Sequence, residues 1–235
     1  EMCIRDSSGA DPVHLPMDPR SRPEDLIGLC LLDVTSEPPA VMVGYLRRDM
    51  PGINLNDPRD IKVMGRSYLS QISHLRVARS KDGIHFTIED HAAIAPRTRM
   101  EEYGCEDARI TQIGDTYYIT YVSPGRYGIT TSLASTRDFV TFERHGVIML
   151  PDNKDVVLLP DKCRGRYVAL TRPMPQSFSK IHGIWVAYSD DLKTWCHQGP
   201  VVLPRPGMWD ELRTGASAVP FRVPEGWLEL YHGVD

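Results

Sequence analysis

Alternating apolar and polar residues, the pattern of half-buried β-strands, are clearest in the middle of the chain. The alternation runs from Ile110 to Tyr121, and further short strands are predicted at Ala40–Arg47, Ser70–Ser80 and His85–Ile88. The Pro-, Asn- and Asp-rich stretch Asp49–Arg66 predicts a long loop. Because no segment shows the 3.6-residue period of a long helix, the pattern predicts an all-β protein.

The N-terminal part of the chain shows a less regular pattern. Residues 8–39 are rich in Pro and Asp and contain one apolar island, Leu26–Val34, so we expect an irregular lead-in with one strand. Residues 1–7 resemble translated sequencing-adapter read-through and are left out of the fold prediction.

Two sequence motifs recur along the chain with a period of about 50 residues. The first has Ser or Thr, then Asp two residues later, then an aromatic residue four positions beyond the Asp; its copies are Ser80–Phe86, Thr136–Phe142 and Ser189–Trp195. The second is a tight turn leading into a β-rich segment; its copies are Gly114–Tyr121, Arg164–Leu170 and Glu225–Tyr231. The two motifs interleave, which indicates a repeated unit of several short strands.

A repeat of this length, with about four strands per unit, is typical of a β-propeller. A β-sandwich with similar turns is the alternative. The predicted blades cover roughly 40–95, 105–150, 153–204 and 211 onward. We therefore predict a lead-in over residues 1–39 and a β-propeller catalytic domain over 40–235. About three and a half blades are present, so we expect a propeller truncated at its C-terminus.

Composition narrows the function classes. The chain has 235 residues, 41% hydrophobic and 25% charged, and a net charge of -4, which gives no electrostatic basis for binding nucleic acid. No apolar run is long enough to span a membrane. The five cysteines are scattered and lack Cys-x-x-Cys spacing, and no basic-then-apolar signal opens the chain, so a cytoplasmic location is predicted and no metal site is expected.

Charged residues recur where successive predicted blades begin their innermost strand or end their second strand. The residues that would face the central channel are Asp107, Lys154, Asp155, Arg172, Arg213 and His232. Lys and Arg are the usual ligands of phosphate groups, Arg through a planar fork and Lys as a point charge. Taken singly, each is a surface charge or part of a structural ion pair. Their recurrence instead predicts an anion site opposite a carboxylate.

From about Tyr45 onward the chain resembles glycoside hydrolase family 130, the β-mannoside phosphorylases and related mannosidases. The matching stretches are Gly104–Arg109, Asn153–Pro160, Gly165–Tyr167 with Arg172–Pro173, Trp209–Asp210 with Gly215, and Gly226–Leu228 with Tyr231–Gly233. The resemblance implies a five-bladed β-propeller.

It also implies inverting phosphorolysis with a single catalytic acid, Asp107. That acid would protonate the glycosidic oxygen through the 3-hydroxyl of the mannosyl unit, while inorganic phosphate attacks from the opposite face to give α-mannose 1-phosphate. Phosphate is then a co-substrate, and no cofactor is implied. The positions that match a phosphate-binding set are Lys154, Arg172, Arg213 and His232. The candidates for binding or positioning the sugar are Arg47 (with Arg48 as competitor), Tyr103, Glu106, Arg109, Asp155, Trp209 and Asp210.

The chain departs from the family pattern in three places. Ala108 replaces the proline of the Glu-Asp-Pro-Arg motif, residues 1–39 lack the early Asn-containing sugar-binding segment, and the last blade is missing. Trp195, which shares its repeat position with Phe86 and Phe142, is predicted to be blade core rather than a sugar platform.

Three functions therefore compete. The first is a β-mannoside phosphorylase acting on an oligosaccharide and phosphate. The second is a β-mannosidase of the same family, with Glu211 or Asp155 as a base for water. The third is a non-catalytic carbohydrate-binding propeller. A homo-oligomer is compatible with each of them.

Overall fold

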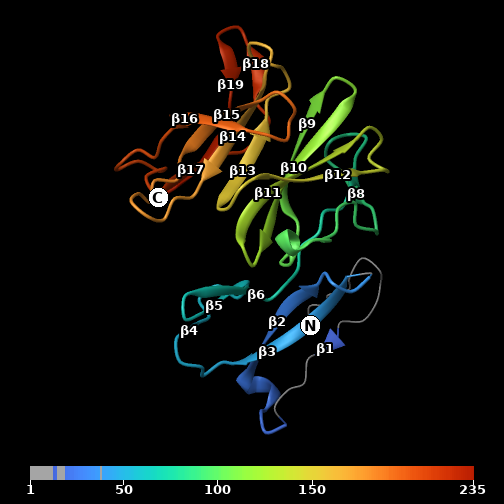
Figure 1. Ribbon diagram of the computed structural model, residues 1–235, viewed down its shortest axis with the longest axis vertical. Helices are drawn as coiled ribbons and strands as arrows, with labels where there is room; N and C mark the ends of the chain where they lie inside the picture. Colours follow the sequence, from blue (N-terminus) through green and yellow to red (C-terminus); the bar gives the residue numbers. More distant parts are fainter. Residues whose placement is uncertain (1–12, 15–18, 38) are drawn as a thin grey trace. The chain divides into compact units, whose positions relative to one another are not determined.

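The computed structural model describes residues 13–14, 19–37 and 39–235, in which β-strands are joined by turns (Figure 1). Within these ranges there is no α-helix, and only two short 3₁₀ turns occur, η1 (Pro23–Asp25) and η2 (Arg99–Glu101). None of the described helical segments is long and apolar enough to cross a membrane. Residues 1–7, the predicted read-through, lie outside the described residues. The chain divides into two compact units, Glu1–Cys105 and Glu106–Asp235.

The first unit is built on a long antiparallel hairpin. Strand β2 (Leu26–Asp33) pairs over its whole length with β3 (Ala40–Arg47), and β1 (Val13–His14) adds to β3 in parallel. The connection begins with an Asx turn, in which Asp33 Oδ1 accepts hydrogen bonds from the backbone N–H and the hydroxyl of Thr35. The apolar island and the first clear strand of the sequence thus form one hairpin.

The remaining strands of this unit are short. They are β4 (Ile53–Asn54), β5 (Asp60–Val63), β6 (Arg66–Leu69), β7 (Ala78–Arg79) and β8 (Thr87–Ile88). The predicted loop 49–66 is therefore wrong in part, because it contains two strands and a turn with positive φ at Met64 and Gly65. The predicted strand 70–80 is also wrong for most of its length, since only β7 is strand. Two-residue strands are too short to show alternation.

The second unit contains two four-stranded antiparallel sheets in which strands pair in chain order. The first sheet consists of β9 (Glu106–Ile113), β10 (Thr116–Gly125), β11 (Gly128–Thr136) and β12 (Glu143–Met149). The second consists of β13 (Asn153–Leu158), β14 (Tyr167–Pro173), β15 (Ile184–Ser189) and β16 (Cys196–Val202). These sheets coincide with the second and third predicted blades.

A third set of strands follows in the same unit. Strand β17 (Arg213–Ala216) pairs with β20 (Tyr231–Val234), and β18 (Phe221–Val223) forms a hairpin with β19 (Gly226–Leu228). The first strands of the successive sheets are neighbours, with β9 against β13 and β13 against β17. This arrangement is that of propeller blades around an axis.

The repeated Ser/Thr-x-Asp motif closes the same turn in all three copies. In each, the hydroxyl accepts backbone N–H groups two and three residues ahead, and the Asp carboxylate does the same from its own position. These backbone hydrogen bonds lower the pKa of Asp191 to about 2. Trp195 packs against the core, as predicted, whereas Phe86 at the matching position is 59% exposed.

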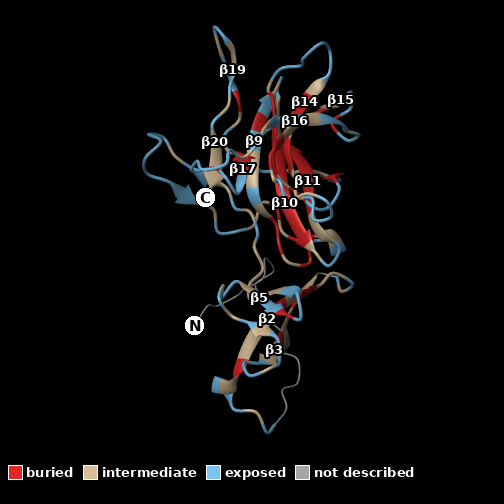
Figure 2. Ribbon diagram, turned by 90° about the vertical axis from the view of Figure 1, so that its left-hand side faces the viewer, coloured by how far each residue is buried: buried red, intermediate tan, exposed pale blue. Residues whose placement is uncertain are grey.

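Buried hydroxyls connect the first sheet to strand β13. Burial concentrates in β10 and β11 (Figure 2), where many fully buried residues are Ser or Thr. One threonine from each of β9, β10 and β11 donates a hydrogen bond to a carbonyl of β13; the pairs are Thr111 with Leu158, Thr120 with Val156, and Thr131 with Asn153. An apolar cluster that includes Leu133, Met149 and Leu158 packs beside them. Strand β13 is therefore fixed by directional bonds as well as by packing.

Candidate active site

Strands β9 and β13 carry the same irregularity near their starts. In β9, Glu106 pairs with Val122 and Arg109 with Thr120, so one extra residue bulges. In β13 the corresponding shift lies between Lys154 and Val157. Both bulges hold an aspartate with positive φ, 52° at Asp107 and 52° at Asp155. Because a non-glycine residue in this region costs about 1 kcal/mol or more, the recurrence of this conformation marks a backbone shape that both strands need.

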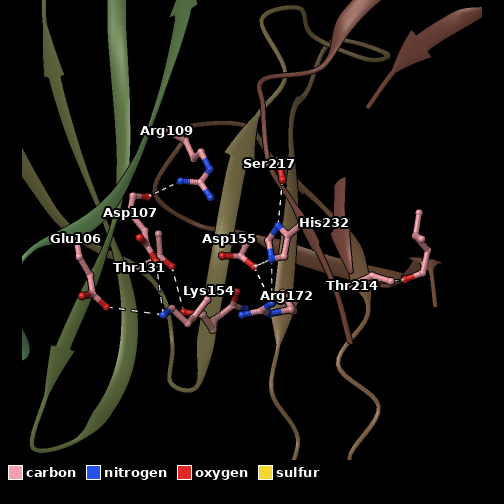
Figure 3. A network of polar contacts seen from close by, with 12 residues as sticks. Glu106, Asp107, Arg109, Thr131, Lys154, Asp155, Arg172, Thr214, Ser217 and His232 are labelled. Atoms are coloured by element: carbon pink, nitrogen blue, oxygen red, sulfur yellow. Dashed lines mark hydrogen bonds and ion pairs between the residues drawn. The ribbon is translucent and has the colours of Figure 1, made fainter. Parts of the chain in front are cut away.

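Asp107 lies beside a lysine of the neighbouring strand (Figure 3). Its Oδ2 is 3.6 Å from Lys154 Nζ, and Glu106 Oε1 is 3.7 Å from the same nitrogen. The Asp107 side chain is 49% exposed, so a substrate can reach it. Arg109 donates from Nη1 to the backbone carbonyl oxygens of Asp107 and Ala108, at 3.1 and 3.4 Å. The Arg109 guanidinium thus holds the backbone of the bulge. In the family motif, a proline at the position of Ala108 would restrict this backbone instead.

Asp155, at the equivalent position, is buried against two basic side chains. Its Oδ2 lies 2.8 Å from Arg172 Nη1 and 3.2 Å from His232 Nε2, and its side chain is only 5% exposed. Burial lowers the pKa of Arg172, and Asp155 and Asp107 oppose that shift. A Cβ added at Gly215 would collide with Asp155 Oδ2 and with the His232 ring, so the glycine makes room for this contact.

His232 is held from its other side by a serine. Its Nδ1 is 3.0 Å from Ser217 Oγ, while its Nε2 lies 3.4 Å from Arg172 Nη1 (Figure 3). The backbone N–H of Ser217 donates to Glu229 Oε1 at 3.2 Å. Neither Ser217 nor Glu229 was singled out from the sequence. The one sequence feature that marks them is the position of Glu229 within the otherwise apolar segment Trp227–Tyr231.

Arg213, at the start of β17, is exposed. Its charge contributes to lowering the pKa of Arg172, which places the two guanidiniums within electrostatic reach. Within the described residues its side chain has no ion-pair partner, in contrast to Arg172 and Lys154. The structure therefore brings Asp107, Lys154, Arg172, Arg213 and His232 onto β9, β13, β14, β17 and β20 of one unit.

An aromatic cluster lies on the loop before β17. The ring of Trp209, 50% exposed, stacks on Tyr231 with centroids 5.4 Å apart. Asp210 is fully buried and accepts hydrogen bonds from Tyr231 Oη at 2.9 Å and Arg205 Nε at 3.1 Å. Although burial opposes ionisation, these two donors hold the pKa of Asp210 below its usual value. Trp209 is thus half exposed, with Tyr231 stacked on its ring and the Arg205 guanidinium 5.9 Å from its centroid.

The other two sugar-binding candidates belong to the first unit. Arg47 ends β3, and its guanidinium pairs with Asp49 at 2.6 Å. Tyr103 is partly buried just after η2. In the part of the chain that the structure describes, no group of His, Cys, Asp and Glu side chains is arranged to hold a metal ion.

Comparisons with known proteins identify the family of the chain. Residues 56–235 match the glycoside hydrolase family 130 profile, described as beta-1,4-mannooligosaccharide phosphorylase. The chain belongs to glycoside hydrolase family 130. It is 41% identical to the beta-1,2-mannobiose phosphorylase of Listeria innocua, over 80% of this chain and 54% of that protein. It is 37% identical to the 1,2-beta-oligomannan phosphorylase of a Thermoanaerobacter species, over 72% of this chain and 55% of that protein.

Solved structures of family 130 agree with the fold. The beta-1,2-mannobiose phosphorylase from Listeria innocua, in complex with beta-1,2-mannobiose, superposes with a TM-score of 0.86 and 36% identity, over 94% of this chain and 62% of that one. The predicted all-β propeller of the five-bladed family type is confirmed. The chain spans about half the length of the curated relatives it matches.

Proposed function

We propose that the protein carrying this chain catalyses inverting phosphorolysis of β-mannosides and releases α-mannose 1-phosphate. One observation carries the proposal: Asp107, whose side chain is half exposed, lies beside Lys154 of the adjacent inner strand and within electrostatic reach of Arg172. A glycosidase that activates water needs a second carboxylate as base, whereas phosphate is already a nucleophile and needs only a cationic site.

In the proposed reaction, Asp107 supplies the proton. The proton passes through the 3-hydroxyl of the mannosyl unit to the glycosidic oxygen, and the bond between that oxygen and the anomeric carbon breaks. A phosphate oxygen forms the new bond to the anomeric carbon from the opposite face. The products are mannose 1-phosphate and the shortened sugar, and their atoms balance those of the mannoside and phosphate.

We assign phosphate binding to Lys154, Arg172, Arg213 and His232. Arg213 is exposed, which suits a direct contact with phosphate, and Lys154 lies between Asp107 and Glu106. Asp155 would serve as the buried counter-ion that keeps Arg172 and His232 in place. Arg172 and His232 need this counter-ion, because a buried charge without a partner is costly.

The sugar would be bound by other residues. We propose Trp209 as a stacking platform and Asp210 as its support through Tyr231, with Glu106 and Arg109 positioning the acid. Arg47 and Tyr103 remain proposed sugar contacts. Short β-1,2- and β-1,4-linked manno-oligosaccharides are the substrates to test first, because the relatives are named for them. A cytoplasmic location and a homo-oligomeric state are also proposed.

The geometry gives little support for the hydrolytic alternative. Asp155 is engaged with Arg172 and His232, and Glu211 accepts a hydrogen bond from the backbone N–H of Gly207 at 2.8 Å. Neither carboxylate is placed as a free base beside Asp107.

The test compares products with and without phosphate. The protein should release mannose 1-phosphate from β-1,2-mannobiose only when phosphate is present. Asp107→Asn should lower turnover by about 10² to 10⁴-fold, because general acid catalysis is worth that much, while sugar binding persists. Asp115→Asn, at an exposed turn, is the matched control and should be unaffected. Free mannose released without phosphate would point to a mannosidase, and sugar binding without any turnover to a lectin.

A further inference from the structure

Glu229 lies at the break between β19 and β20, where the polypeptide passes close to the cationic site. Its Oε1 accepts a hydrogen bond from the backbone N–H of Ser217, across the sheet. Its Oε2 is shielded from solvent and, among the described residues, has no hydrogen-bond partner. A carboxylate in such a position is costly unless charged groups around it compensate.

Two basic side chains are connected to this carboxylate. Arg109 of β9 acts on Glu229 through its charge, and its Nη1 holds the Asp107 bulge. His232 of β20 is linked to it through Ser217. Burial outweighs the Ser217 hydrogen bond and the Arg109 charge, and raises the pKa of Glu229 to about 7.

Ser217 connects the two groups directly. Its backbone N–H is shared between Glu229 Oε1 and the carbonyl of Leu230, and its hydroxyl meets His232 Nδ1. The opposite ring nitrogen, Nε2, faces Asp155 and Arg172. The contact of one ring nitrogen of a histidine sets the hydrogen-bonding role of the other. A group that holds Ser217 against Nδ1 therefore also sets how Nε2 faces the site.

We propose that Glu229 is a positioning residue of the phosphate site: by holding Ser217 it sets the orientation of His232 and the ring nitrogen that faces the site. The inference rests on the proposed function only in calling the site a phosphate site. The charged groups that face this chain of contacts are Arg109, Asp155 and Arg172. Loss of the Ser217 contact would leave the imidazole free to turn away from Asp155 and Arg172 and would weaken anion binding.

Three variants separate the roles of shape and charge. Glu229→Gln keeps an acceptor for Ser217 but carries no charge, Glu229→Leu removes both, and Ser217→Ala removes the hydroxyl. Glu225→Gln, an exposed glutamate in the same segment, is the control. The first measurement is the ring-nitrogen NMR spectrum of His232 against pH, assigned with His232→Asn. The second is the phosphate KM and kcat of the protein.

We expect Glu229→Leu and Ser217→Ala to change the His232 tautomer ratio and to raise the phosphate KM about 5- to 20-fold, with kcat changed less. Glu229→Gln, which keeps the acceptor for Ser217, should keep the tautomer ratio and a phosphate KM within about twofold of the wild type. Unchanged His232 spectra in Glu229→Leu would overturn the inference, whatever the activity. A wild-type protein that does not use phosphate would instead overturn the proposed function, and the NMR result would still decide the role of Glu229.

Discussion

Asp107 and Asp155 share a backbone conformation and a position in consecutive sheets, but their side chains have different surroundings. Asp107 is half exposed beside Lys154, and Asp155 is buried against Arg172 and His232. The same bulge thus holds the proposed acid in one strand and its network's counter-ion in the next. The difference arises from the residues opposite, where Val122 in β10 corresponds to Arg172 in β14.

Gly215 tests how closely this network is packed. Gly215→Ala should raise the phosphate KM about tenfold and lower the free energy of unfolding by about 1–3 kcal/mol, because the new methyl group must displace Asp155 or His232. Steady-state kinetics and urea denaturation measure both effects. Gly199→Ala, where a Cβ meets open space, is the control and should change neither. Wild-type kinetics in Gly215→Ala would show that the contact is dispensable.

Some residue roles were accessible from the sequence and others were not. Repeat spacing predicts Asp107 and Lys154 at the start of an inner strand and Arg172 at the end of a second strand, and the structure has them near the starts of β9 and β13 and the end of β14. The spacing does not show whether Lys154 or Asp155 is the equivalent of Asp107, because each bulge adds one residue and no glycine marks its position. Glu229 escaped detection because its partner Ser217 is close only through the pairing of β17 and β20.

At the scale of elements, the hydrogen bonds from threonine hydroxyls of the first sheet to β13 contribute to stability separately from apolar packing. Apolar packing is non-directional, whereas a hydrogen bond to a defined carbonyl fixes one strand at a particular position against its neighbour. Strand β13 receives three such bonds over its length. It is also the strand that carries Lys154 and Asp155, so the fixed element is one that holds residues of the proposed site.

Thr120→Val measures one of these bonds. The change keeps the side-chain shape but leaves the buried Val156 carbonyl without the threonine hydroxyl as donor, so the free energy of unfolding should fall by about 1–3 kcal/mol. Urea denaturation checks the value. Thr87→Val, at an exposed strand position, should have an effect below about 0.5 kcal/mol. Equal effects at both positions would mean that the bond adds nothing specific.

The strands themselves were predictable where they were long. Blade boundaries from the repeats agree with the two four-stranded sheets, because each turn motif closes through its own local hydrogen bonds. The first unit was predicted less well. Its short strands between Asp49 and Ser80 pair with near neighbours in the chain, β4 with β5, β5 with β6 and β7 with β8. Each is only two to four residues long, so alternation of apolar and polar residues cannot show them.

At the scale of the whole molecule, stability should depend on pH through Glu229. Its folded-state pKa of about 7 exceeds the unfolded value of 4.5, so the folded state binds more protons between these values. The free energy of unfolding should therefore fall as pH rises from about 4.5 to 7, by about 1–2 kcal/mol after allowance for solvent screening. Thermal denaturation across this range should show that slope in the wild type and a flatter curve in Glu229→Gln.

Glu225→Gln supplies the comparison, since it removes an exposed carboxylate from the same segment. Its curve should follow the wild type. Asp191 acts in the opposite direction and at lower pH, because its pKa is about 2 in the folded state, so its stabilising contribution is lost only as pH falls from 3.8 through that value. An identical slope in wild type and Glu229→Gln would mean that Glu229 is not the titrating group.

The bulges in β9 and β13 divide each of these strands into two parts, and each part has its own alternation of inward and outward side chains. Side chains alternate between faces along a regular strand, so a shift by one residue would exchange every inward and outward position. A bulge absorbs that shift locally, and the length of β9 or β13 beyond it keeps its own alternation. Residues on the site side of a bulge can therefore change without exchanging the inward and outward positions of the blade behind them. The buried charges of the network must still change together with their partners, because a buried charge left alone is costly.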